Sequence, residues 1–267
     1  MIDMIFLFVL LFLAIIFLFV VFPSIRRHPD REILNNLYIA HRGLHCRENG
    51  IPENSVSAFS NAIVNGFAIE TDIRLTRDGE VVVFHDENLK RMCGQDAKIE
   101  NLTLSELRQY KLLNTNERIP SFKEFLDLVE GRVPLLLEFK CNAKNCKQLC
   151  IAANRLLKEY NGKYFVQSFY PGVPFWYRKN RNDILRGQLA TVFKEKNDLR
   201  KFLSPFIFNF LTRPDFVAYD VKFSKRFMFC LQKILGAFSV GWTFKKNAQL
   251  EKLKNDFKAY IFEDFMP

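Results

Sequence analysis

Residues 68–75 read Ala68-Ile69-Glu70-Thr71-Asp72-Ile73-Arg74-Leu75, a run typical of a β-strand that carries two acids in apolar company. Because side chains alternate along a strand, Glu70 and Asp72 share one face and the residues between and beside them share the other. Two carboxylates on such a strand are costly to bury unless a cation neutralises them. This stretch therefore predicts both a sheet and a cation site.

Seven further runs with strand character occur along the chain, one before this stretch and six after it, and helical patterns separate most of them. The helix expected over residues 52–66, for example, has Asn54 or Ser55 as its N-cap and Gly66 at its end. Eight strands separated by helices predict a (β/α)8 barrel. An open, doubly wound sheet is the runner-up, but no Gly-rich phosphate loop follows the first strand. The expected strands cover residues 37–42, 68–75, 135–140, 164–169, 184–189, 216–220, 238–243 and 259–263.

One connection departs from this alternation. Asp78-Gly79 stands between two β-rich runs, so residues 80–85 are expected to return antiparallel to the second strand as a hairpin. With a two-residue loop, Asp72 lies opposite His85 and both side chains point to the same face. A three-residue loop would shift the register by one and turn His85 away. Residues 86 to about 118 then form a small insertion.

Polar residues recur at the ends of other expected strands, where a parallel barrel has its active site. Glu138 and Lys140 share a face at the end of the run 135–140. Together with Glu70 and Asp72, Glu138 offers oxygen ligands for Mg²⁺ or Ca²⁺. The alternative is that the three acids form structural salt bridges.

The chain has only four histidines, at positions 28, 41, 45 and 85. His41 ends the first strand and His85 ends the hairpin, so both are expected beside the carboxylates. Two histidines so placed suggest an acid/base pair whose pKa values the neighbouring charges adjust. Arg42 and Lys140 supply donors for phosphate oxygens.

Short motifs around these residues resemble those of the glycerophosphodiester phosphodiesterase family. They occur in order between about residues 38 and 264. The matching stretches include Ala40-His41-Arg42-Gly43, Pro52-Glu53-Asn54-Ser55, Ile69-Glu70-Thr71-Asp72, Val82-Val83-Phe84-His85-Asp86, Leu137-Glu138-Phe139-Lys140 and Gly241-Trp242-Thr243.

The resemblance implies a barrel of the phosphoinositide-phospholipase type and metal-dependent hydrolysis of glycerophosphodiesters to sn-glycerol 3-phosphate and an alcohol. One departure is that Phe244-Lys245 follows Trp242-Thr243, where the family often carries Asn. By resemblance, the acid/base pair is His41 and His85, the metal ligands are Glu70, Asp72 and Glu138, the phosphate contacts are Arg42 and Lys140, and Trp242 forms a wall for the alcohol.

An apolar segment precedes the barrel. Nineteen residues from Met4 to Phe22 carry neither a charge nor a polar group, long enough for a helix to span nearly the ~30 Å core of a bilayer. The segment starts with Asp3 and lacks a basic start and a small-residue cleavage site, which favours an uncleaved anchor over a signal peptide. A buried core helix is the alternative. We therefore expect an anchor over residues 1–25, a polar linker over residues 26–36 and the barrel over residues 37–267.

The distribution of charge bears on location and partners. Arg26, Arg27 and Arg31 follow the apolar segment and no Lys or Arg precedes it, which favours a cytoplasmic barrel on a single-pass membrane protein. The net charge of +10 suits anionic partners, but the basic residues are scattered, so nucleic acid is not expected. The expected partners are the diester substrate and a lipid bilayer, and no protein partner is implied.

Two other functions stay open. A lysophospholipase D would act on membrane lysolipids, and the anchor would keep it near them. For such an enzyme the Phe-rich residues 202–211 could touch the bilayer, whereas packing on the barrel is the simpler expectation. A non-catalytic membrane-bound binding barrel is the third possibility. It is disfavoured because a degenerate relative should have lost one of the two histidines or three acids.

Overall fold

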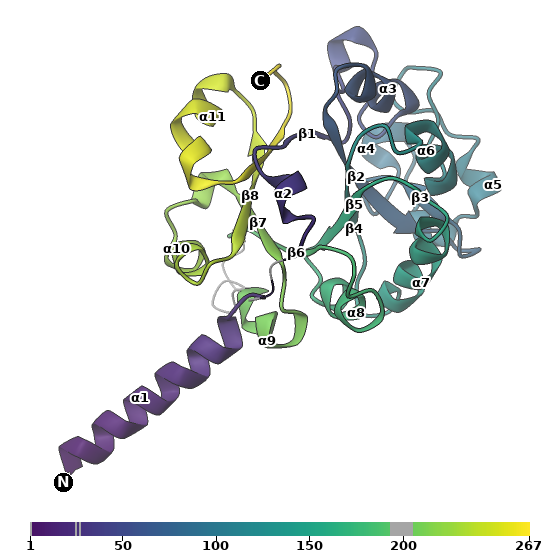
Figure 1. Ribbon diagram of the computed structural model, residues 1–267. Coiled ribbons are helices and arrows are strands. Elements are labelled where there is room, and N and C mark those ends of the chain that lie inside the picture. Colours follow the sequence, from purple (N-terminus) through teal and green to yellow (C-terminus); the bar gives the residue numbers. More distant parts are fainter. Residues whose placement is uncertain (1, 25, 27, 193–204) are drawn as a thin grey trace.

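The computed structural model describes residues 2–24, 26, 28–192 and 205–267, and within them eight parallel strands close into a ring (Figure 1). The closing pair joins β1 to β2, while β1 also pairs with β9. This closure confirms the (β/α)8 barrel and excludes the open sheet. The ring consists of β1 (Tyr38–His41), β2 (Ala68–Leu75), β4 (Leu135–Phe139), β5 (Tyr164–Ser168), β6 (Arg186–Ala190), β7 (Phe216–Asp220), β8 (Phe238–Phe244) and β9 (Ala259–Phe262).

Helices pack around the outside of the ring and start where the sequence supplies caps. Ser55 caps α3 by accepting a hydrogen bond from the Ala58 amide, and Ser121 and Glu124 form a capping box at the start of α6. The outer helices are α3 (Val56–Val64), α6 (Phe122–Val129), α7 (Cys146–Leu157), α8 (Gly172–Asn180), α9 (Asn209–Thr212), α10 (Phe227–Ile234) and α11 (Asn247–Leu253), with short 3-10 turns η4 (Pro205–Phe208), η5 (Val221–Phe223) and η6 (Lys254–Asp256).

The interior of the barrel is filled with apolar side chains from the strands. The short helix α2 (Arg31–Leu34) covers the end at which the strands begin, and it lies over the centre of the ring in Figure 1. Leu34 of α2 is fully buried in the interior cluster, while Trp242 packs on the same cluster. Part of the segment expected as a polar linker is thus the floor of the barrel.

The hairpin forms as β3 (Val81–Val83) antiparallel to β2, but the predicted register is wrong by one residue. Thr76 pairs with Glu80, so the loop has three residues, and Gly79 adopts a φ of +80°. The Thr76 hydroxyl bonds to Asp78 Oδ1 and accepts from the Glu80 amide, which stabilises the wider loop. Asp72 therefore lies opposite Phe84 instead of His85, as the 2.9 Å bond from the Phe84 amide to the Asp72 carbonyl shows.

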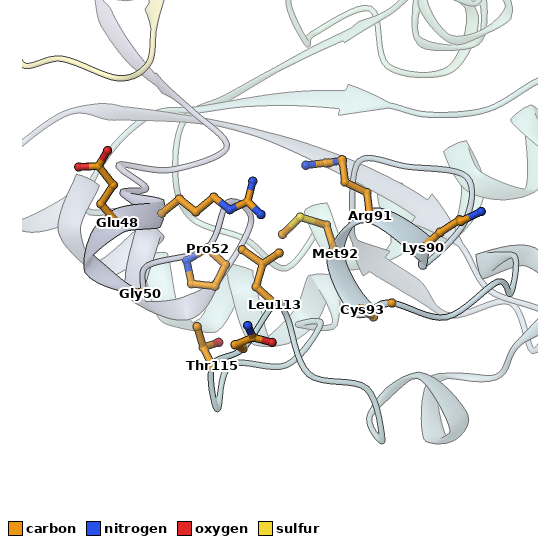
Figure 2. Close-up of a pocket in the computed structure, with 12 residues that line it drawn as sticks. Glu48, Gly50, Pro52, Lys90, Arg91, Met92, Cys93, Leu113 and Thr115 are labelled. Carbon is orange, nitrogen blue, oxygen red and sulfur yellow. The ribbon is translucent and has the colours of Figure 1, made fainter.

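The chain after the hairpin packs as a small subdomain against β3. Residues 86–118 contain α4 (Lys90–Cys93), η2 (Ile99–Asn101) and α5 (Leu104–Leu107), which form an apolar cluster with Val82 and Phe84. A cavity of about 500 Å³ separates α4 from the loop around η1 (Arg47–Asn49), and Arg91 and Met92 line it (Figure 2). The insertion thus borders the loop that follows β1.

The N-terminal helix α1 (Ile2–Val21) projects from the barrel beside α9 (Figure 1). Its stretch Met4–Val21 has a mean hydropathy of 3.5 and is almost entirely exposed. The helix is therefore long and apolar enough to cross a membrane, a property that signal sequences share. Its last turn is fixed to the barrel: Val21 is fully buried, and its carbonyl oxygen accepts hydrogen bonds from Asn209 (2.7 Å) and Gln232 (2.9 Å).

Candidate active site

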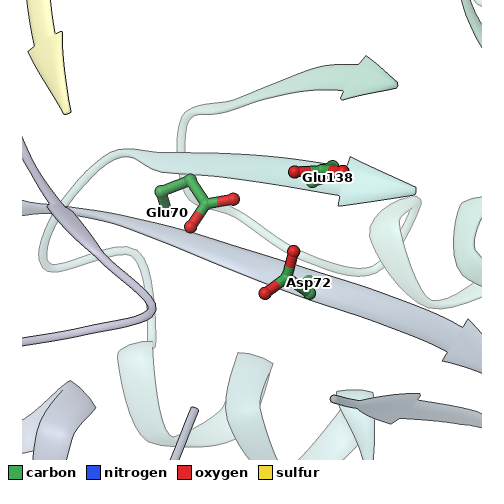
Figure 3. A group of neighbouring side chains, drawn as sticks. All are labelled: Glu70, Asp72 and Glu138. Carbon is green, nitrogen blue, oxygen red and sulfur yellow. The ribbon is translucent and has the colours of Figure 1, made fainter. Parts of the chain in front are cut away.

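Three carboxylates meet on β2 and β4, toward the ends of these strands. In the parallel register Asp72 lies beside Glu138, and Glu70 precedes Asp72 by two residues on the same face. Figure 3 shows the three side chains directed toward a common space. One oxygen from each lies within 4.8 Å of the others, and all three residues are buried. The alternation on residues 68–75 thus brings the acids together as expected.

This cluster fits a hard divalent cation. Asp72 Oδ1 and Glu138 Oε1 are both buried, and the ammonium of Lys140 lies beside both oxygens. Burial and the charges of Asp72 and Glu138 raise the pKa of Glu70 well above its ordinary value. Burial likewise raises the pKa of Glu138, assisted by Asp72. Three buried carboxylates this close together, two of them with raised pKa values, could hold a metal ion such as Mg²⁺ or Ca²⁺.

Two cations flank the acids. Lys140 Nζ lies 3.1 Å from Asp72 Oδ1 and 2.5 Å from Glu138 Oε1. Arg42 places Nε 3.3 Å from Asp72 Oδ2 and donates its backbone amide to Glu70. Burial opposes ionisation of Asp72, but Lys140 and other nearby positive charges outweigh it and lower its pKa. Both predicted phosphate contacts therefore lie against the carboxylate cluster.

His41, the last residue of β1, lies between two carboxylates. Its Nδ1 contacts Glu263, the residue that follows β9, and its Nε2 lies 3.9 Å from Glu70 Oε2. Burial lowers the pKa of His41, and the hydrogen bond to Glu263 opposes this shift. The Nε2 atom is thus the one that faces the acid cluster. His45 also lies near Glu263, at 3.9 Å.

His85 reaches the same site by a route other than the predicted strand register. β3 ends at Val83, and the His85 carbonyl then accepts two hydrogen bonds from Arg74, at 2.9 and 2.7 Å. Its ring interacts electrostatically with Asp72 and Lys140, and Nδ1 lies 2.6 Å from Asp86 Oδ1. Burial lowers the pKa of His85 to about 4. Each candidate histidine therefore has a carboxylate on Nδ1.

The sequence reasoning assigned no role to several residues that position this site. Glu263 holds His41, although only its place after the last strand signalled it. Asn54, within the Pro-Glu-Asn-Ser motif, donates to Asp72 Oδ2 at 3.0 Å. Arg91 bonds to both Glu53 and Asp86, at 2.7 Å each, and so links the carboxylates that hold Arg42 and His85.

A cavity of about 250 Å³ adjoins the acid cluster. It is lined by Glu138, Lys140, Phe169 and Tyr170, among others. Trp242 stands beside it, with its ring centroid 5.6 Å from that of Phe169 in an edge-to-face arrangement. The indole Nε1 is buried and makes no hydrogen bond. Trp242 thus lies at the acid-bearing end of the barrel, on the side of β5 and β8.

Comparison with known proteins gives relatives over part of the chain. A glycerophosphodiester phosphodiesterase from Caldanaerobacter subterraneus is 31% identical over 136 residues, covering 48% of this chain and 55% of the relative. A human lysophospholipase D is 30% identical over 168 residues, covering 58% of this chain and 51% of the relative. The chain thus spans about half the length of these curated relatives.

Solved structures share the fold over most of the chain. A phosphodiesterase from Oleispira antarctica, solved in complex with the product sn-glycerol-3-phosphate, superposes with a TM-score of 0.72 at 22% identity, covering 87% of this chain and 94% of the other. A glycerophosphodiester phosphodiesterase from Thermotoga maritima gives a TM-score of 0.67 at 24% identity, with coverage of 85% and 94%. Residues 41–171, just under half of the chain, match the glycerophosphoryl diester phosphodiesterase family.

Proposed function

We propose that the protein hydrolyses glycerophosphodiesters to sn-glycerol 3-phosphate and an alcohol, with a divalent metal ion. The observation that carries this proposal is the buried cluster of Glu70, Asp72 and Glu138 with His41 beside it and His85 within electrostatic reach. Such an arrangement combines a cation site with two proton-transfer groups, as metal-assisted hydrolysis requires.

Arg42 and Lys140 bind and orient the phosphate. Both are held at the acid cluster by ion pairs, and both carry N–H donors suited to phosphate oxygens. The pKa of Lys140 is raised, because the negative charges of Asp72 and Glu138 outweigh the opposing effect of burial. Lys140 is therefore a charged ammonium group at neutral pH. Glu70, Asp72 and Glu138 would hold the metal ion, which would supply Lewis-acid stabilisation of the negative charge that develops on the phosphoryl oxygens.

The two histidines move the protons. With a pKa of about 4, His85 is neutral at neutral pH and accepts a proton from the attacking water molecule. His41 protonates the leaving alcohol oxygen; burial lowers its pKa, and the hydrogen bond to Glu263 on Nδ1 offsets part of this shift in favour of the imidazolium form. One P–O bond forms to the attacking oxygen and the P–O bond to the alcohol breaks.

Two classes of diester fit this chemistry, a small soluble glycerophosphodiester and a lysophospholipid. The human relative named lysophospholipase D supports the second class. The attachment of α1 supports the first, because Val21 binds near the strand-start end of the barrel and the acids lie toward the other end. We favour the soluble diester, which reaches the site without help from α1.

We further propose that α1 is an uncleaved single-pass anchor with the barrel on the cytoplasmic side. Arg26 and Arg31 follow the helix, whereas Arg27 lies outside the described residues. Phe208, Phe210 and Leu211 of the Phe-rich run are exposed near α1, while residues 202–204 lie outside the described part. Mass measurement of the membrane fraction and protease protection test the anchor and its orientation. Loss of residues 1–25 from the mature protein would contradict the anchor.

A direct assay tests the activity. Purified full-length protein is incubated with glycerophosphocholine or lysophosphatidylcholine, with Mg²⁺ or Ca²⁺ and with a chelator. We expect glycerol 3-phosphate from the first substrate and loss of turnover on chelation. Lysophosphatidic acid as the main product would favour lysophospholipase D activity. No turnover of either substrate with either metal would favour a non-catalytic barrel.

A further inference from the structure

A second polar site lies where α1 joins the barrel. A cavity of about 590 Å³ is lined by four arginines from four different segments, together with Phe19 and Phe22. We call it the arginine cavity. Its arginines are Arg26 after α1, Arg178 on α8, Arg186 at the start of β6 and Arg213 after α9. Since β6 begins here, the cavity lies at the end of the barrel opposite the carboxylate cluster.

The charges in the arginine cavity are not balanced. Asp215 is the carboxylate partner of Arg26 (3.1 Å) and of Arg186 (3.3 Å). Within the described part of the chain, Arg178 and Arg213 make no ion pair. Among the described residues, two of the four guanidinium groups thus share the carboxylate of Asp215 and the other two have none. An anion in the cavity would relieve the excess positive charge.

The arginines are held in place by uncharged oxygens. Arg178 donates to the backbone carbonyls of Phe210 (3.1 Å) and Leu211 (2.7 Å). Arg213 donates to those of Phe19 (3.2 Å) and Phe22 (2.8 Å). Within the described part of the chain these bonds engage only Nη1 of each residue, which leaves the other guanidinium N–H groups for a phosphate oxygen.

Repulsion among the arginines is visible in their ionisation. Burial lowers the pKa of Arg186 to about 10, and the positive charges of Arg26 and Arg178 contribute to this shift although Asp215 opposes it. Burial and the charge of Arg178 also lower the pKa of Arg213. The four groups are therefore close enough to interact, and a single multivalent anion could contact several of them.

The position of the cavity indicates which anion it takes. Phe19 and Phe22 lie at the end of the apolar helix, and the Arg213 guanidinium is 4.8 Å from the centre of the Phe19 ring. If α1 spans a bilayer, this level is that of the lipid phosphates, where basic residues bind anionic head groups. We infer that the arginine cavity binds the phosphate group of an anionic phospholipid. The inference depends on α1 lying in a bilayer and is independent of the proposed hydrolysis.

The test measures binding to the full-length protein in a neutral detergent. Short-chain phosphatidylglycerol is titrated and compared with phosphatidylcholine of the same chains and with inorganic phosphate, using calorimetry and thermal unfolding. We expect phosphatidylglycerol alone to bind tightly and raise the Tm. The double variant R178Q/R213Q should bind it roughly 30-fold more weakly, at about 1 kcal/mol per basic residue.

Two control variants make the result specific. R132Q removes an arginine that likewise donates to backbone carbonyls, those of Leu128 and Val129, but lies outside the arginine cavity. It should bind phosphatidylglycerol as the wild type does. R178K/R213K keeps both charges and should retain most of the affinity for phosphatidylglycerol. If R178Q/R213Q fails to fold, the affinity of R178K/R213K still tests the inference. Three results would overturn the inference. They are equal binding of phosphatidylglycerol and phosphatidylcholine, wild-type binding of phosphatidylglycerol by R178Q/R213Q, and binding of inorganic phosphate as tight as that of phosphatidylglycerol.

Discussion

Glu263 holds Nδ1 of His41 although the two residues are 222 positions apart in the chain. They meet because β1 and β9 are neighbours in the closed ring, so the residues at the ends of these strands are adjacent. The contact fixes the ring so that Nε2 points toward Glu70. Burial opposes ionisation of Glu263, but bonds from His41 and His45 outweigh it and lower its pKa, so the carboxylate is charged at neutral pH.

We therefore expect Glu263→Gln to lower kcat by about 10²-fold or more, because the imidazolium form of His41 loses its stabilising charge. Binding of the substrate phosphate, and hence KM, should change little. Glu251→Gln, which removes an exposed carboxylate paired with Lys254, is the matched control. Steady-state kinetics over pH 5–9 measure the effect. An unchanged kcat and pH profile would show that Glu263 does not position His41.

The two histidines can be tested by removal. His41→Ala and His85→Ala should each lower kcat by about 10²–10⁴-fold, the range typical of a positioned acid or base. His45→Ala should have a much smaller effect, because His45 touches Glu263 only at 3.9 Å and is not among the proposed proton donors and acceptors. If His45 proved essential and His85 dispensable, the proposed acid/base pair would be wrong.

Arg91 links the insertion to the active site. Half exposed on α4, it bonds to Glu53 and to Asp86. Burial opposes ionisation of Glu53, but the bonds from Arg91 and Arg42 lower its pKa to about 2. We expect Arg91→Gln to lower kcat about tenfold by loosening Arg42 and His85, with little change in Tm.

Arg108→Gln provides the comparison for Arg91, since Arg108 is similarly exposed and pairs with Glu124 away from the site. Kinetics and thermal unfolding of both variants separate the two possibilities. An Arg91 variant with wild-type kcat, or equal losses in both variants, would mean that the insertion does not position the site.

Metal binding should depend on pH. Because the pKa of Glu70 and that of Glu138 are raised in the metal-free protein, protons compete with the metal for these oxygens. The affinity for Mg²⁺ or Ca²⁺ should therefore fall as the pH is lowered through these raised pKa values, and binding should release protons. Calorimetry in two buffers of different ionisation enthalpy measures the release. Binding that is independent of pH, or full turnover after exhaustive chelation, would contradict the carboxylate site.

The sequence predicted the barrel well because each strand has a local signature. All eight expected strands are present, with ends that differ by at most two residues. The meeting of Glu70, Asp72 and Glu138 could also be anticipated, since alternation along a strand and convergence of strand ends are general properties of parallel barrels. The roles of these residues stay predictions until the variants are made.

The errors have physical causes that strand patterns do not contain. The hairpin register depended on the Thr76 hydroxyl, whose bonds to Asp78 and Glu80 favour a three-residue loop. Contacts between distant segments, such as Glu263 with His41, depend on barrel closure and have no local signal. The segment expected as a polar linker also contains Ile33 and Leu34, and two apolar residues are too few for a periodicity that would reveal their packing under the barrel.

Truncation separates the anchor from the fold, and the structure shows where to cut. Val21 is fully buried, and its carbonyl oxygen satisfies the amides of Asn209 and Gln232. A protein lacking residues 1–19 keeps these contacts of Val21, loses the contacts of Arg213 with Phe19, and should have nearly wild-type Tm and wild-type kcat on soluble diesters. One lacking residues 1–25 loses the burial of Val21, worth about 1.5–3 kcal/mol, and two hydrogen bonds of about 1 kcal/mol each.

The longer truncation should therefore unfold about 10 °C lower while keeping kcat on soluble diesters below its Tm, because the proposed site residues begin only at His41. Both truncated proteins should lose activity on lysolipid in vesicles, since α1 raises the local concentration at the membrane without changing the chemistry. Thermal unfolding and parallel assays on the two substrate types measure these effects. If removal of residues 1–19 reduced activity on both types equally, α1 would be a structural part of the enzyme and the proposed division between anchor and barrel would be wrong.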